Sequence, residues 1–122
     1  MTARRFAYTF VNTLSPDEQA RVFDRYVVPE SRRVPRETLT RTARVDFKAP
    51  HAPLLLVAGS EDHIIPPPLN RANFRRHTHG ASLTTFKEFP GRTHFIIGQE
   101  GWEEVAQFVN DWLERNILEV IR

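Results

Sequence analysis

The chain has 122 residues, of which 40% are hydrophobic and 26% are charged, and its formal net charge at pH 7 is +2. This length suits one domain with a single core, and this composition argues against wholesale disorder. The sequence contains no cysteine, which excludes disulfides, thiol catalysis and cysteine metal sites. The arginines are scattered among acidic residues rather than gathered in one patch, so we expect no nucleic-acid partner.

Hydropathy also limits the location of the protein. The longest uninterrupted apolar run covers residues 54–58, which is far too short to cross a bilayer. Nothing at the N-terminus resembles a secretory signal peptide. We therefore predict a cytoplasmic protein without a membrane partner.

The first part of the chain, residues 1–48, is predicted to be helical and to contain no strand. It opens with apolar residues that need a partner surface: Phe6, Tyr8, Phe10 and Val11. Ser15 is a candidate N-cap, the next residue is a proline at the first helical position, and Glu18 completes a capping box. Pro35 is expected to start a second, short helix through residues 37–44.

The second part, residues 49–122, alternates between strand and helix patterns. Residues 53–59 form a continuous apolar run that ends at glycine, which is typical of a strand buried on both faces of a parallel sheet. A helix at 69–76, a strand at 83–89 and an amphipathic helix at 101–116 are expected to follow. This order predicts an α/β fold with two parallel strands. Two strands cannot bury both faces and both edges of a sheet, so the chain should belong to something larger.

An acid and a histidine follow the two predicted strands. Asp62 comes three residues after Gly59, beside the alternative carboxylate Glu61, and His94 follows the second strand through a Pro-Gly turn. Because the carboxyl ends of parallel strands meet at one sheet edge, we expect the acid and the imidazole to lie close together. A carboxylate bonded to one ring nitrogen lets the other nitrogen act as a general base. The ordinary alternatives are an acid that only caps a turn and a histidine that only packs.

Residues 53–112 resemble the last two strands and the closing helix of the α/β-hydrolase fold. In that family a strand of the form P-L-L-L-V-A-G is followed by an acid three residues after the glycine, and then by an apolar pair and proline. Here the acid is Asp62, followed by Ile-Ile-Pro, and His94 stands ahead of a helix that carries Trp112. The chain order, acid before histidine, is also that of the family.

The resemblance implies roles for these residues. Asp62 would orient His94, and His94 would activate first a serine and then water during hydrolysis of an ester, amide or similar small substrate. Residues 1–48 resemble the helical cap that such enzymes insert before the acid-bearing strand. The implied partner is a small molecule, whose identity depends on the cap and on the half of the fold that this sequence lacks.

The nucleophile of the family is absent from this sequence. It stands in a G-x-S-x-G elbow, and none of the serines lies in such a motif: Ser15, Ser31, Ser60 and Ser82. The H-G type oxyanion loop is missing as well, and Ser60 lacks the strained turn that presents a nucleophile. We therefore predict a truncated α/β-hydrolase that is inactive alone and is completed by an N-terminal half or a complementing chain. The alternative is a non-catalytic interaction or binding module derived from a hydrolase, such as a homodimer that closes its sheet edge.

The remaining histidines and the tryptophans receive simpler interpretations. His63 adjoins Asp62 and is expected to line the same loop. A metal could use Asp62, His77 and His79, but two histidines at i,i+2 in a loop are weak indicators, so neither a metal nor a cofactor is predicted. Two aromatic residues are expected to anchor the closing helix in the core: Trp102 and Trp112.

Overall fold

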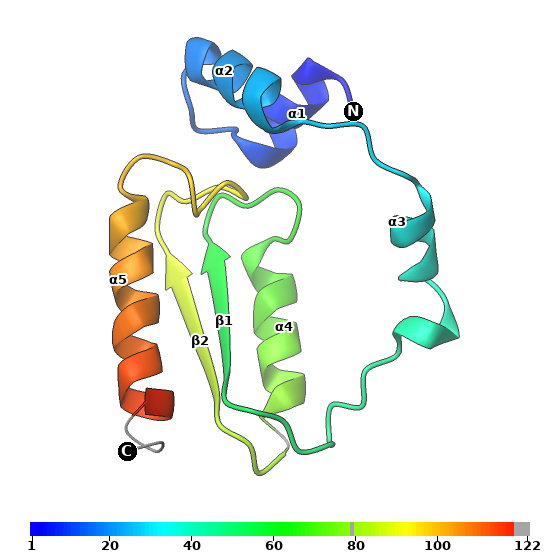
Figure 1. Ribbon diagram of the computed structural model, residues 1–122, viewed down its shortest axis with the longest axis vertical. Helices are drawn as coiled ribbons and strands as arrows, with labels where there is room; N and C mark the ends of the chain where they lie inside the picture. The colour runs from blue at the N-terminus through cyan, green and yellow to red at the C-terminus, as the bar shows by residue number, and fades with distance from the viewer. Residues whose placement is uncertain (79, 119–122) are drawn as a thin grey trace.

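The computed structural model describes residues 1–78 and 80–118. Its centre is a parallel sheet of two strands, flanked by two helices (Figure 1). The elements of this part are, in chain order, β1 (Leu54–Gly59), α4 (Pro67–His77), β2 (Thr84–Phe89) and α5 (Trp102–Leu113). The alternation of strands and helices confirms the predicted α/β arrangement with a parallel pair.

The two helices of this part cover opposite faces of the sheet. On one face Phe86 of β2 packs against Phe74 of α4, with 5.8 Å between the ring centres. The preceding strand residue, Thr85, points to the other face, because successive strand side chains alternate. There its Oγ1 accepts a hydrogen bond from Trp112 Nε1 of α5 at 2.9 Å. Trp112 is 5% exposed, so the prediction that it anchors the closing helix is confirmed.

Among the described residues, strand β1 pairs along one edge, with β2. Its register with β2 runs from Leu54 opposite Thr84 to Gly59 opposite Phe89. Within the described residues no strand pairs with its other edge. Ala58 and Gly59 are buried, but the rest of the strand is only half-buried, so the expected burial along its whole length is not reached. The reason is physical: an apolar strand needs neighbours on both edges and cover on both faces.

The first part of the chain is helical, as predicted. Its elements are α1 (Ala3–Phe10), α2 (Pro16–Tyr26), α3 (Arg33–Glu37) and the 3₁₀ turn η1 (Arg41–Ala43). Helices α1 and α2 pack through Phe6, whose ring lies 5.1 Å from that of Phe10 and 5.5 Å from that of Phe23. Both helices lie over the carboxyl ends of the strands (Figure 1). Of the four apolar opening residues, Tyr8 remains exposed.

The predicted capping box at the start of α2 is present. Ser15 Oγ accepts a hydrogen bond from the Glu18 backbone N–H at 3.4 Å, and Glu18 Oε2 accepts one from the Ser15 backbone N–H at 3.0 Å. These two bonds satisfy backbone donors that have no partner inside the helix. The start of this helix was therefore readable from sequence alone.

The prediction of a helix through residues 37–44 is wrong. Helix α3 begins earlier, at Arg33, and places Pro35 in the first turn, where a missing N–H removes no helical hydrogen bond. It ends at Glu37, where the hydroxyl of Thr38 donates to the carbonyl of Pro35 at 2.7 Å. A side chain that takes up a terminal carbonyl competes with continuation of the helix.

The closing helix is shorter than the predicted span of 101–116. Gly101 has φ of +76° and forms the N-cap, because this left-handed conformation lies outside the α-helix. Beyond Leu113 the chain continues as a π-helical turn, η2 (Glu114–Leu118), in which Asn116 Nδ2 donates to the Trp112 carbonyl at 2.7 Å. Among the helices of the described residues, none has the length and apolar character that crossing a membrane requires.

Candidate active site

Asp62 lies in the tight turn that follows β1, and it is only 8% exposed. Its Oδ1 accepts hydrogen bonds from the backbone N–H groups of Ile64 at 2.8 Å and Ile65 at 2.9 Å. Its own N–H donates to the carbonyl of Gly59 at 3.3 Å. The turn therefore holds the carboxylate in place and leaves its second oxygen, Oδ2, for another partner.

That partner is His94. The distance from His94 Nδ1 to Asp62 Oδ2 is 2.9 Å. A carboxylate only accepts hydrogen bonds, so Nδ1 carries the proton and Nε2 keeps its lone pair. No described residue forms a hydrogen bond with Nε2, and the His94 side chain is 28% exposed. The structure thus brings the two predicted residues together, with a shielded acid behind an imidazole that solvent can reach.

The loop that carries His94 is held on both sides. Thr93 is fully buried, and its backbone N–H and its hydroxyl both donate to Gln99 Oε1, at 3.0 and 3.2 Å. On the other side, the Phe95 N–H donates to the carbonyl of Phe10 at 3.1 Å. The Phe10 ring meets the His94 ring edge-on, with 4.7 Å between their centres. The sequence indicates that Phe10 needs a partner surface but not that His94 supplies it, and no local pattern assigns a role to Gln99.

Gly59 lets the two loops touch. A Cβ at this position would collide with the Arg92 carbonyl and would lie 2.9 Å from the carbonyl oxygen of Thr93. The Glu61 N–H donates to that same Arg92 carbonyl at 2.9 Å. Only a residue without a side chain allows this approach, so the glycine that ends the apolar run also sets the distance between Asp62 and His94.

The side chains of Ser60 and Glu61 take part in hydrogen bonds that hold the two turns together. Ser60 Oγ accepts a hydrogen bond from the Gly91 N–H at 2.8 Å and donates to Glu61 Oε1 at 3.1 Å. These bonds tie the turn after β1 to the turn after β2. Of the two candidate carboxylates, it is therefore Asp62 and not Glu61 that meets His94, and Ser60 does not replace a nucleophile.

His63 follows Asp62 in the chain, but its side chain turns toward α1. Its Nδ1 donates to the carbonyl of Tyr8 at 2.8 Å, and its Nε2 lies 3.5 Å from Asn12 Nδ2. His63 thus stands in the turn that carries Asp62, and its ring bonds to the backbone of α1. Its role is to attach α1 to the edge of the sheet.

The alternative metal set is also ruled out by position. Helix α4 runs back from the carboxyl edge and ends at His77, at the opposite end of the sheet from Asp62 (Figure 1). The third member, His79, lies outside the described residues. Among those that are described, no three His, Asp or Glu side chains are arranged to hold a metal ion.

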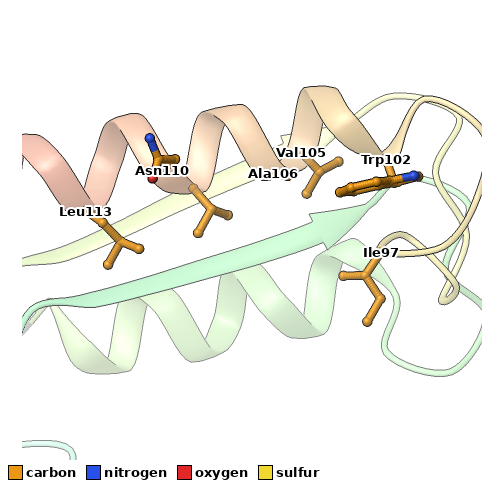
Figure 2. Close-up of a pocket in the computed structure, with 7 residues that line it drawn as sticks. Ile97, Trp102, Val105, Ala106, Asn110 and Leu113 are labelled. Carbon is orange, nitrogen blue, oxygen red and sulfur yellow. The ribbon is translucent and has the colours of Figure 1, made fainter.

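An apolar groove of about 420 Å³ runs along α5. Figure 2 shows that its aliphatic side chains point toward the sheet, over β1. The residues that line it are Ile97, Trp102, Val105, Ala106, Val109, Asn110 and Leu113. Trp102 is 46% exposed at the rim, so the prediction that it is a core anchor is wrong. The helix has an apolar face broader than this sheet can cover.

Comparison with known proteins gives no match: no protein-family model, curated protein or solved structure is significantly similar to this chain.

Proposed function

We propose that this chain is the acid and histidine portion of an α/β-hydrolase. The parent activity is serine-type hydrolysis of an ester, amide or similar small substrate. The observation that carries the proposal is the 2.9 Å hydrogen bond between Asp62 Oδ2 and His94 Nδ1 at the carboxyl edge of a parallel sheet. Ligands of open α/β sheets bind at this edge.

In this reaction His94 Nε2 accepts the proton of a serine hydroxyl while the serine oxygen bonds to the substrate carbonyl carbon. Asp62 stabilises the imidazolium, which then returns the proton to the leaving alkoxide or amine. Water repeats the sequence and releases the acid product. The serine and the oxyanion donors come from polypeptide beyond these 122 residues, so this chain alone is expected to be inert.

The open side of the molecule supports this proposal. The free edge of β1 offers backbone groups to another strand, and the groove over β1 offers an apolar surface to a helix. Helices α1 and α2 take the place of a cap, since Phe10 packs against the His94 ring. The missing elements would thus meet the surfaces that this chain leaves uncovered.

The test begins with the coding DNA upstream of Met1, which should encode a G-x-S-x-G elbow. The two parts are then produced together and assayed with p-nitrophenyl butyrate. His94→Ala should lower kcat by at least about 10³-fold, and Asp62→Asn by a comparable factor, because each removes a triad member. Glu61→Gln alters the neighbouring carboxylate and should leave activity intact. Absence of an elbow, or equal rates for His94→Ala and the wild type, would refute the proposal.

A second candidate function is a non-catalytic interaction module that closes its own sheet edge as a homodimer. The combination of an unpaired β1 edge and an apolar groove favours it. Sedimentation equilibrium separates the cases. A dimer weakened by Val109→Glu in the groove supports the module, whereas a stable folded monomer contradicts it.

A further inference from the structure

A pair of histidines lies at the other end of the sheet from Asp62 and His94. His51 stands just before β1, and His77 is the last residue of α4. Their ring centres are 5.3 Å apart, and the ring planes are nearly perpendicular at 88°. Phe47 packs on His77 with 4.9 Å between ring centres, and the Arg76 guanidinium lies over the Phe47 ring. The pair is therefore partly screened from solvent by an aromatic side chain.

Each of these histidines has a buried ring nitrogen that lacks a hydrogen-bond partner among the described residues: Nε2 of His51 and Nδ1 of His77. The state of His51 follows from its other nitrogen. His51 Nδ1 lies 2.7 Å from the carbonyl oxygen of Ala52, which can only accept, so Nδ1 carries the proton. His51 Nε2 consequently presents a lone pair. A buried polar atom without a partner is unfavourable, so each of these nitrogens calls for an explanation, and a bound ion is one that fits both.

We propose that His51 Nε2 and His77 Nδ1 bind one divalent transition-metal ion, of which zinc is the reference case. Zinc–imidazole bonds of about 2.0–2.1 Å with tetrahedral angles place two ring centres about 5 Å apart. The observed separation of 5.3 Å fits this geometry. Metal-binding histidines usually donate their other N–H to a carbonyl or carboxylate, and the bond from His51 to Ala52 is of that kind.

The two imidazoles supply two of the four ligands of a tetrahedral ion, and water molecules supply the other two. No thiolate competes, because the sequence contains no cysteine. An imidazole pair favours copper and zinc over magnesium or calcium, which prefer oxygen ligands. The ion would join the segment that precedes β1 to the end of α4. This site is independent of the proposed hydrolase chemistry.

The test is calorimetric titration of the full chain with ZnCl₂ after treatment with EDTA. We expect one saturable equivalent, and tighter binding of CuCl₂, as the order of divalent metal affinities requires. His51→Gln and His77→Gln should each weaken zinc binding at least tenfold. His63→Gln alters a histidine bonded to α1 instead, and should change the affinity less than twofold. Absence of saturable binding, or equal weakening by all three substitutions, overturns the proposal.

Two further readouts keep the proposal testable if a histidine variant unfolds. In the wild type, the electron paramagnetic resonance spectrum of the copper complex should show hyperfine coupling to two imidazole nitrogens. Saturating zinc should raise Tm in the wild type by mass action, because only the folded chain brings the two rings together. A copper spectrum without nitrogen coupling, or a Tm that zinc leaves unchanged, contradicts the site.

Discussion

Each end of the sheet carries a histidine with one bonded ring nitrogen, and the two ends differ in the partner that holds this nitrogen. At the carboxyl end His94 donates to a carboxylate, whereas at the amino end His51 donates to a backbone carbonyl. A carboxylate stabilises the imidazolium and so suits proton transfer. A neutral carbonyl also fixes the tautomer, but it supplies no charge that would stabilise an imidazolium. The two histidines thus share a fixed tautomer and differ in whether a negative charge stands beside the ring.

The largest loss of stability is expected from a change at Gly59, which lets the two loops touch at the carboxyl end of the sheet. Gly59→Ala forces a Cβ into the Arg92 carbonyl, and we expect it to cost about 3 kcal/mol of unfolding free energy. Urea unfolding measures this loss. Gly91→Ala is the matched control, because Gly91 has φ of +69° but open space around it, and it should cost about 1–2 kcal/mol. A larger loss for Gly91→Ala would show that the contact between the loops is unimportant.

The next largest loss of stability is expected at Asp62, whose side chain both accepts backbone hydrogen bonds and orients His94. Asp62→Ala leaves the N–H groups of Ile64 and Ile65 without their acceptor, and should cost about 2 kcal/mol in urea unfolding. Asp62→Asn keeps an acceptor oxygen for them and should cost less. Its amide would instead donate to His94 Nδ1, so the proton moves to Nε2, which ¹⁵N NMR of the imidazole detects. An unchanged His94 tautomer would contradict the orienting role of Asp62.

The carboxyl end of the sheet can be predicted from the sequence better than the amino end, and the reason is physical. The carboxyl end is encoded locally: an apolar run, a glycine and an acid follow one another, and parallel pairing brings the loop of His94 to the same edge. The amino end has no such local code. His51 and His77 meet only because α4 returns the chain along the sheet, and that packing has no sequence signature.

The helices show the same distinction. The start of α2 was predicted because a capping box is formed by neighbouring residues. The ends of α3 and α5 were not, because hydroxyl and amide side chains of Thr38 and Asn116 compete for the last carbonyls. Trp102 and Trp112 lie on one amphipathic helix, but the sheet is wide enough to cover only Trp112. Periodicity predicts which face is apolar, and the neighbouring elements decide how much of it is buried.

A smaller loss of stability is expected from a change at Trp112, which bonds to the second residue of β2, near the amino end of the strand. Trp112→Phe removes the hydrogen bond to Thr85 and some packing on the sheet, and should cost about 1–2 kcal/mol in urea unfolding. Trp102→Phe alters the exposed tryptophan at the groove rim and should change stability by less than about 0.5 kcal/mol. Neither change should alter the His94 tautomer. Equal losses would mean that the groove is covered in solution, which is the behaviour expected of a homodimer.

The smallest loss of stability is expected from a change in the capping box of α2. The pKa of Glu18 is held below its ordinary value, mainly by the hydrogen bond from the Ser15 hydroxyl at 2.6 Å and then by the Ser15 backbone N–H. A carboxyl whose pKa is lower in the folded state contributes stability above its unfolded pKa, and this contribution disappears as pH falls through the folded pKa. Ser15→Ala removes the cap and should cost about 1 kcal/mol at pH 7.

Because the variant also loses the hydroxyl that lowers the pKa of Glu18, part of its deficit depends on the charge of that carboxylate. The stability gap between the wild type and Ser15→Ala should therefore narrow as the pH falls from 7 to below the ordinary pKa of glutamate, where both proteins carry a neutral Glu18. Urea unfolding at several pH values measures the gap. A gap that is constant with pH would assign the whole effect to the backbone cap and none to the carboxylate. The His94 tautomer should be the same in both proteins, since the hydrogen bond of His94 Nδ1 is to Asp62 and involves neither Ser15 nor Glu18.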